Sequence, residues 1–129
     1  PLGLLPEVSG GKDQFGMHRY QWEGGGYASF EPHGNDVSVD YLKRGSSAPR
    51  GSGGEMLARS MRAAGIQRPA ALVAPNILQK AAKSNDVIER SLRSAAESLG
   101  GTVTRVTSGV DADKHWMKVE ISYNSSGCP

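Results

Sequence analysis

Cysteine is almost absent from this sequence, because 129 residues contain only one, Cys128. A single thiol cannot form an internal disulfide and has no second cysteine with which to bind a metal. The motifs H-E-x-x-H, C-x-x-C and G-x-S-x-G and the EF-hand spacing are missing too, and Asp111 and Asp113 form only a D-x-D in a turn. We therefore expect a fold without disulfides and a site without a metal ion.

Long apolar runs and aromatic side chains are also few. Hydrophobic residues make up 37% of the chain and aromatic residues 6%, and no segment approaches the roughly 20 apolar residues of a membrane-spanning helix. The opening PLGLLPEV is too short and too interrupted by proline for a signal peptide. These features predict one small domain with a modest core and no stable membrane association.

Charge is unevenly distributed, although the formal net charge is only +2. Residues 1–42 carry two basic and six acidic side chains, whereas residues 43–93 carry ten basic and three acidic ones. This excess of basic residues indicates a face for a polyanion or for an acidic protein partner. The alternative is that helices in this region simply expose solvated arginines.

Glycine and proline divide the chain into its expected segments. We predict an irregular lead-in over residues 1–16, one domain over 17–124 and a flexible tail over 125–129. In the domain, HRYQWE and YASFEP are expected to form a hairpin across three glycines. The next segment, DVSVDYLK, alternates strictly. Its expected faces are Val37, Val39 and Tyr41 on one side and Ser38, Asp40 and Leu42 on the other.

Two helices and three further strands complete the pattern. The first helix is expected within residues 46–65, and AALVA after it reads as a buried central strand. The second helix is expected to start at Asn76 as its N-cap, with a break near Ser84, and to stop at Gly100. TVTRVTS and KHWMKVEISY are the last two strands. The order β-β-β-α-β-α-β-β predicts an α+β fold, a single twisted, mostly antiparallel sheet with two main helices packed on it.

The first helix has recognisable start and stop signals in SSAPRGSGGEMLARSMRAAG, residues 46–65. Ser52 and Glu55 have the spacing of a capping box, in which each side chain hydrogen-bonds an amide at the helix start. The apolar residues that follow recur at helical spacing, and Gly65 is placed to terminate the helix.

The glycines before this helix predict a phosphate site. They bare backbone amides at the positive end of the helix dipole, and Arg50 adds a cation. The residues expected to contact phosphate or RNA are Arg50, Gly51, Ser52, Gly53, Gly54, Arg59, Arg62 and Trp116. The alternative is a well-capped helix behind a flexible turn, with no ligand.

Histidines are the candidates for acid–base chemistry. Two histidines beside a phosphodiester can act as general base and general acid in RNA cleavage near neutral pH, without a metal. His18 opens the first strand of the domain and His115 the last, with Lys118 nearby to stabilise charge on phosphorus. His33 lies in a turn, where an idle histidine is common. A buried structural role is the alternative for His115, which shares its face with apolar residues.

Strand aromatics divide into core and candidate stacking residues. Tyr20 and Trp22 share one face of their strand, and we expect them in the core. Trp116 lies opposite the apolar face of the last strand, and is the better candidate for stacking on a base.

The segment P-R-G-S-G-G-E-M-L, opening a helix after a β-meander and followed by a strand that ends near an asparagine, resembles acyl-CoA-dependent N-acetyltransferases. In that family an R/Q-x-x-G-x-G/A signature at a helix start cradles the pyrophosphate of CoA. Residues 50–54 fit this signature only loosely, and the two N-terminal helices usual in the family are missing. The resemblance implies a compact CoA-dependent N-acyltransferase.

A second resemblance covers residues 20–123, through YQWEGGGYASF, SGGEMLARSMRAAGI, PAALVAPNIL, SLRSAAESLGGTVT and HWMKVEIS. This succession is similar to the C-terminal toxin domains of bacterial polymorphic toxins of the contact-dependent inhibition and Rhs types. The resemblance implies a toxin that is secreted or displayed as part of a larger protein, acts in the cytoplasm of a neighbouring cell, and is blocked by a cognate immunity protein. RNA cleavage, with tRNA as the usual target, is among the commonest activities of the family.

The leading sequence hypothesis is therefore a metal-independent ribonuclease toxin that cleaves tRNA, needs no cofactor and is monomeric outside the immunity complex. The compact acyltransferase is the first alternative. A non-catalytic module, whose basic face docks an acidic partner, is the second.

Overall fold

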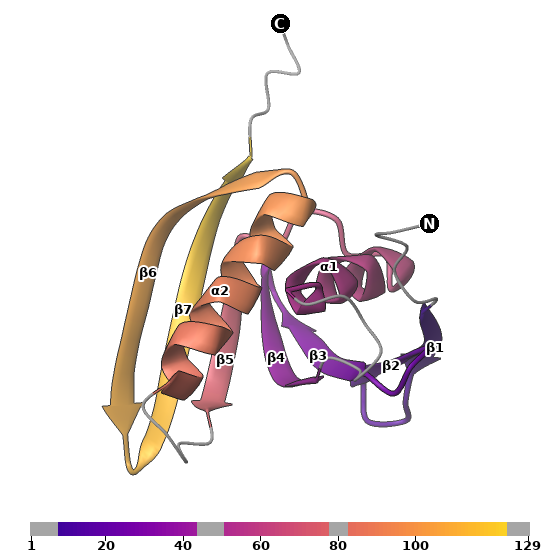
Figure 1. Ribbon diagram of the computed structural model, residues 1–129, viewed down its shortest axis with the longest axis horizontal. Helices are drawn as coiled ribbons and strands as arrows, with labels where there is room; N and C mark the ends of the chain where they lie inside the picture. The colour runs from indigo at the N-terminus through magenta and orange to yellow at the C-terminus, as the bar shows by residue number, and fades with distance from the viewer. Residues whose placement is uncertain (1–7, 44–50, 78–82, 124–129) are drawn as a thin grey trace, which may run out of the picture.

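The computed structural model describes residues 8–43, 51–77 and 83–123 (Figure 1). Its elements, in chain order, are β1 (Val8–Lys12), β2 (His18–Trp22), β3 (Tyr27–His33), β4 (Asp36–Lys43), α1 (Gly53–Ala63), β5 (Ala71–Ile77), α2 (Lys83–Ser98), β6 (Gly101–Asp111) and β7 (Lys114–Tyr123).

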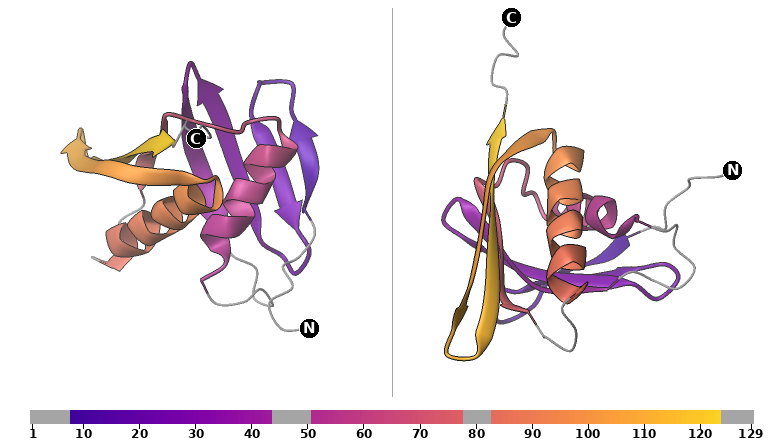
Figure 2. Two further views of the ribbon diagram at one scale, coloured as in Figure 1. Left: turned by 90° about the horizontal axis from the view of Figure 1, so that it is seen from above. Right: turned by 60° about the vertical axis from the view of Figure 1, so that its left-hand side comes forward.

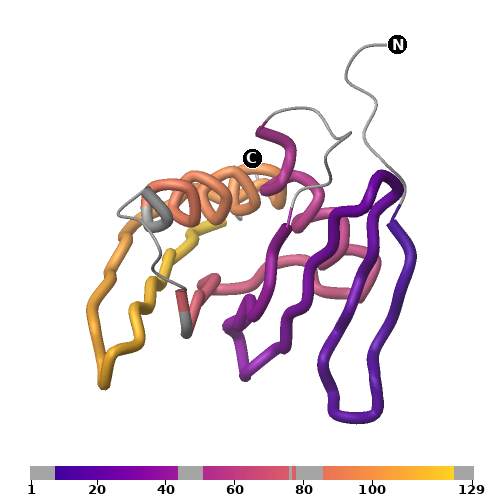
Figure 3. The backbone as a smooth tube through the Cα atoms, turned by 60° about the horizontal axis from the view of Figure 1, so that its bottom comes forward, coloured from indigo at the N-terminus to yellow at the C-terminus, as the bar shows by residue number. Residues whose placement is uncertain are grey.

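All seven of these strands belong to one sheet, in the order β1-β2-β3-β4-β5-β7-β6. The pairing of β4 with β5 is parallel and the other five pairings are antiparallel. Figure 3 shows the succession, with the β6–β7 hairpin at one end and the β1–β2 hairpin at the other. The predicted α+β fold, one mostly antiparallel sheet carrying two helices, is confirmed.

Both helices lie on the same face of the sheet, inside its bend (Figure 2). Apolar side chains from this face and from the helices form the core. Trp22 was expected in the core and is only 3% exposed. Its indole Nε1 donates a hydrogen bond of 2.9 Å to Ser60 Oγ, which ties β2 to α1. The opposite face of the sheet carries no helix in the described structure, and is called the open face below.

The expected irregular lead-in is wrong for residues 8–12, which form the edge strand β1, paired with β2 from Val8↔Trp22 to Lys12↔His18. The segment VSGGK has no alternation of apolar and polar residues from which a strand could be predicted. A Cβ on Gly10 would lie 2.1 Å from the carbonyl oxygen of Arg19, so glycine is what lets the two strands approach.

The prediction that β4 alternates strictly is also wrong, because a bulge interrupts the alternation. Phe30 pairs with Val39, but Ser29 pairs with Tyr41, so Asp40 is the extra residue. Val39 remains buried, Leu42 packs against the core, and Tyr41 is 47% exposed. The bulge therefore exchanges the predicted faces of Tyr41 and Leu42.

The predicted start of the second helix is wrong as well. β5 continues through Asn76 to Ile77, which pairs with His115, so Asn76 is not an N-cap. A register irregularity between Ala74 and Ile77 accommodates Pro75, whose nitrogen has no hydrogen to donate to a neighbouring strand. α2 runs unbroken from Lys83 to Ser98, without the expected break near Ser84.

The ends of α1 agree with the prediction in part. Ser52 is the N-cap and is buried, but its side chain makes no capping hydrogen bond, so the expected capping box does not form. At the other end Gly65 has a φ of +85°. The amides of Gly65 and Ile66 donate to the carbonyls of Arg62 and Met61, which is the Schellman arrangement expected for a terminating glycine.

Candidate functional site

The parallel junction between β4 and β5 opens along its length. Three residue pairs form the ladder, from Asp36↔Ala71 to Ser38↔Val73. Beyond them β4 continues to Lys43 and β5 to Ile77, and no pair joins these continuations among the residues described. The two strands diverge toward their carboxyl ends (Figure 1). We call this opening the split. In open α/β sheets, ligands bind outside the carboxyl ends of parallel strands.

A pocket of about 410 Å³ lies beside the part of β4 that follows Ser38. This part pairs with β3 but not with β5, and we call it the free part of β4. Its wall consists of Leu42 from β4, Gly51 and Gly53 at the start of α1, and Val87, Ile88, Arg90, Ser91 and Ser94 from α2. This volume falls within the range of roughly 300–1,000 Å³ that is usual for small-molecule sites. The pocket thus joins the glycine-rich helix start to the split.

The start of α1 presents backbone rather than side chains to the pocket. Gly51 has a φ of +82°, a conformation that glycine adopts without strain. A Cβ on Gly51 or on Gly53 would meet no atom within 4 Å, so an incoming group can approach the backbone closely. The amides of a first helical turn point out of the helix and lie at its positive end. An anion is the ligand that this geometry suits.

Gly54 fixes the position of this helix start. A Cβ there would lie 2.5 Å from both the carbonyl oxygen of Ser91 and the Cβ of Ser94. Only glycine allows α1 to approach α2 so closely, and the two helices thereby enclose one side of the pocket.

The α2 wall mixes one cation with hydroxyl and apolar groups. Arg90 is exposed, and its Nε lies 3.4 Å from the carbonyl oxygen of Asp86 one turn earlier. Arg93, which is outside the pocket lining, forms an ion pair of 2.8 Å with Glu89. Val87 is 49% exposed although it is apolar. The wall therefore offers Arg90 to a negative group and Val87 to an apolar one.

Aromatic and acidic side chains gather on the open face beside the split. Tyr41 stacks on Tyr27 of β3 with a centroid distance of 4.8 Å, and the hydrogen bond with Tyr41, together with burial, raises the pKa of Tyr27. Burial raises the pKa of the bulge residue Asp40, the negative charge of Glu31 raises it further, and His33 opposes both. His33 Nε2 is 3.9 Å from Glu31 Oε2.

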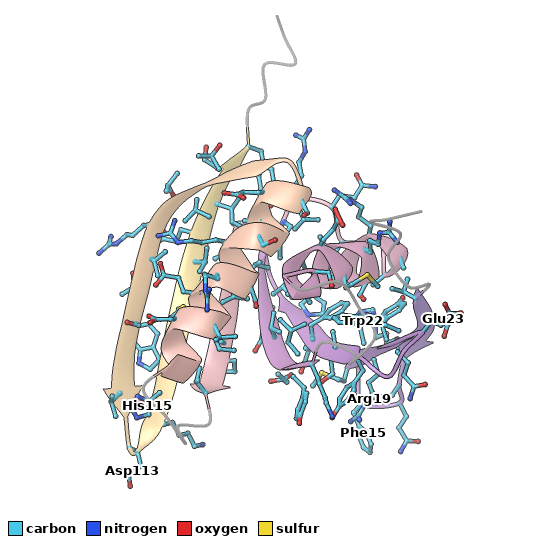
Figure 4. All side chains as sticks on the ribbon, in the orientation of Figure 1. Phe15, Arg19, Trp22, Glu23, Asp113 and His115 are labelled. Carbon is cyan, nitrogen blue, oxygen red and sulfur yellow. The ribbon has the colours of Figure 1, made fainter. Side chains whose placement is uncertain are left out.

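The two histidines expected to share proton transfer do not meet. His18 is on β2 and His115 on β7, and β3, β4 and β5 lie between those strands. Four strand spacings of about 4.8 Å put them roughly 19 Å apart along the sheet. Figure 4 shows His115 near the tip of the β6–β7 hairpin and Arg19, the neighbour of His18, at the opposite end. His18 stacks on Phe30 at 5.5 Å, and its buried Nδ1 has no hydrogen-bond partner in the described structure.

Lys118 and Trp116 lie on the other face of β7 from His115. Lys118 Nζ is 3.8 Å from Asp36 Oδ2, on the open face. Trp116 covers Gly109 of β6, where an added Cβ would lie 3.0 Å from the indole. His115 and Lys118 therefore do not form a shared site, and Trp116 lies beyond β5 from the split.

The predicted phosphate-binding arginines are dispersed. Arg59 is exposed within α1. Arg62, in the last turn of α1, donates from Nη2 to the carbonyl oxygen of Ser98 at the end of α2. Arg50 lies outside the residues that the structure describes. Of the predicted phosphate contacts, Gly51 and Gly53 line the pocket, while Ser52 and Gly54 are buried at the same helix start.

Sequence reasoning missed the residues that α2 and β4 contribute to the pocket. Arg90 and Ser94 occur on a helix whose partner surface no local pattern specifies, so no signal could have paired them with the glycines. Leu42 was assigned to the wrong face because the bulge was not visible. The glycine-rich helix start was the one signal that did find the pocket.

Within the described residues, no cluster of histidine, cysteine, aspartate or glutamate is arranged to hold a metal ion. Nor does any described helix have the length and hydropathy to cross a membrane. Comparison of the chain with protein-family models, with curated proteins and with solved structures gives no match.

Proposed function

We propose that this domain is a CoA-dependent N-acyltransferase that holds its acyl donor in the pocket between α1, α2 and the free part of β4. The observation that carries the proposal is that three features lie together: a helix start lined by glycine, a pocket of about 410 Å³, and the split between two parallel strands. The helix start suits the pyrophosphate of an acyl-CoA, and the split suits its pantetheine arm.

The pyrophosphate of the donor fits the start of α1. Gly51 and Gly53 leave room for its oxygens to reach backbone amides, and the helix dipole favours the negative charge. Arg90 on the facing wall supplies a guanidinium, which suits phosphate oxygens.

The pantetheine arm fits the split. The arm is an extended chain with two amides. Beyond the paired residues, the edges of β4 and β5 that face the split offer unpaired backbone N–H and C=O groups to such a chain. Leu42 and Val87 provide apolar surface for its methylene groups. The thioester would lie where pairing of β4 and β5 resumes, at Ser38 and Val73.

This proposal takes up the acyltransferase alternative from the sequence in preference to the ribonuclease. The ribonuclease needs His18 and His115 at one phosphodiester, and three strands separate them. The acyltransferase needs accessible backbone at a helix start beside a pocket, and Gly51 and Gly53 at the start of α1 supply this.

Isothermal titration with acetyl-CoA tests the proposal. We expect binding by the unaltered protein and at least about tenfold weaker binding by Gly53→Glu, because a carboxylate at the helix start repels phosphate; tenfold corresponds to about 1.4 kcal/mol. Gln67→Glu adds the same charge at an exposed position outside the pocket and is the matched control. Absence of acetyl-CoA binding by the folded, unaltered protein would refute the proposal.

The toxin hypothesis concerns delivery and target, and acyl transfer is compatible with it. Inducible expression in bacteria, with total RNA analysed on a denaturing gel, separates the two chemistries. Growth arrest with intact RNA supports an acyltransferase toxin. Discrete tRNA fragments that disappear in His18→Ala or His115→Ala would restore the ribonuclease and contradict acyl transfer as the toxic activity.

A further inference from the structure

The side chains of β4 beside the split point to two opposite sides of the sheet. Leu42 lines the pocket on the helix side, and its neighbour Tyr41 lies on the open face. The helices occupy the first side, so with the acyl donor in the pocket, a second substrate has access to the thioester through the split from the open face. The character of that face beside the split therefore determines which acceptor can approach.

Three residues define this character, and we call them the acceptor surface: Tyr27, Asp40 and Tyr41. The stacked rings of Tyr27 and Tyr41 present aromatic surface, and aromatic faces attract cations. Asp40 stands at the bulge, immediately before Tyr41 on the free part of β4. Glu31 adds a second carboxylate on β3, partly balanced by His33 at 3.9 Å. Aromatic rings beside carboxylates suit an ammonium group on an apolar stem.

The shape of the open face indicates how that ammonium group is presented. The helices lie inside the bend of the sheet, so the open face is its outer side (Figure 2). Small-molecule sites usually enclose 70–90% of their ligand, and an outward face without covering elements in the described structure encloses little. A side chain that projects from a larger molecule needs no such enclosure.

We propose that the acyl acceptor is the side chain of a lysine on another protein, bound by the acceptor surface and brought to the thioester through the split from the open face. This inference rests on the proposed function. Tyr27 and Tyr41 hold the lysine stem and its charge, and Asp40 faces the ammonium group.

The reaction is then a direct transfer. The ammonium group gives one proton to the Asp40 carboxylate, and the free amine attacks the carbonyl carbon of the thioester. An N–C bond forms, the C–S bond breaks, and the second amine proton passes to the leaving thiolate. The products are an amide, free CoA thiol and a protonated Asp40, which releases its proton to water. Burial and Glu31, which raise the pKa of Asp40, favour its acceptance of the proton.

The test measures acetylation of acetyl-Ala-Lys-Ala-amide and of spermidine by the whole chain, with acetyl-CoA binding measured separately by calorimetry. We expect the peptide to be the better acceptor. Tyr41→Ala should raise KM for the peptide at least about fivefold, in line with the one or more kcal/mol of a cation–aromatic contact, with acetyl-CoA binding unchanged. Tyr41→Phe keeps the ring and should restore most of the loss. Asp40→Asn should lower kcat and flatten its rise with pH.

Phe15→Ala is the matched aromatic control, because Phe15 is 77% exposed in the turn between β1 and β2. Equal KM in Tyr41→Ala and Phe15→Ala would overturn the acceptor surface, as would a preference for spermidine over the peptide. If acetyl-CoA binds and no lysine peptide is acetylated, the inference fails while the donor site stands. If acetyl-CoA does not bind, the proposed function itself has failed.

Discussion

The β6–β7 hairpin and the β4–β5 junction are built from the same kind of strand, yet they differ in how completely they pair. β6 and β7 share ten residue pairs with one irregularity, whereas β4 and β5 share three. The hairpin is closed by a turn at Ala112 and Asp113, both with positive φ, and each of its strands has its neighbour along nearly the full length. The junction is closed at one end only.

This difference separates a region that holds the fold from one that is available to a ligand. In the hairpin the facing edges of β6 and β7 pair with each other along nearly their full length, so those backbone groups are not available to a substrate. At the junction the core continues beneath the three remaining pairs, because Val37 and Leu72 are 2% and 0% exposed. Those pairs must join the half-sheet carrying α1 to the half-sheet carrying α2, while the strands beyond them remain apart.

The largest expected effect comes from weakening those pairs. Leu72→Ala removes a fully buried side chain at the centre of the junction and should lower the free energy of unfolding by about 2–5 kcal/mol, the range for such truncations. Val106→Ala, on the partly buried outer strand β6, should lower it by less. Urea denaturation of both variants measures the contrast. An equal loss in both would mean that the junction has no special role in joining the two halves.

A smaller effect is expected where the two helices meet. Gly54→Ala places a Cβ 2.5 Å from backbone and side-chain atoms of α2, and the strain should lower the free energy of unfolding by about 1–3 kcal/mol. The same substitution at Gly53, where a Cβ would meet nothing within 4 Å, should change it little. Thermal denaturation of the two variants compares adjacent glycines. A neutral Gly54→Ala would show that α1 and α2 are not held this closely.

The same contrast between regular and interrupted pairing separates the features that the sequence predicts from those that it does not. Regular elements were predictable. An apolar face was expected on the last strand opposite Trp116, and its residues Met117, Val119 and Ile121 are buried, because β7 keeps its alternation along its length. The α1 terminator at Gly65 was predictable because a left-handed residue after a helix has a strong glycine preference. Such features depend on residues close together in the chain.

The candidate site depends on residues that are distant in the chain or break the local pattern. The bulge at Asp40 inserts one residue into an otherwise regular strand, and nothing in DVSVDYLK marks it. The pairing of β7 between β5 and β6 is a long-range choice, and it is what places His115 far from His18. The glycine-rich helix start could be recognised from the sequence, but the pocket wall on α2 could not.

The smallest expected effect is electrostatic and lies at the bulge. Burial and the charge of Glu31 raise the pKa of Asp40 above its ordinary value, so between its unfolded and folded pKa values the folded chain binds more protons than the unfolded chain. Its contribution to stability therefore falls as pH rises from about 4, the unfolded pKa, through the folded pKa, and it stays unfavourable at neutral pH.

Asp40→Asn removes this unfavourable charge, so the variant should be slightly more stable than the unaltered protein at pH 7, and the gain should shrink toward pH 4. Urea denaturation at the two pH values measures it, and Asp111→Asn, at an exposed end of β6, is the control. A gain that is the same at both pH values would show that ionisation of Asp40 is not its source. A gain in stability confined to neutral pH would mean that the charge of Asp40 destabilises the folded chain. If the same variant also loses acetylation, the reaction needs the carboxylate that the fold disfavours.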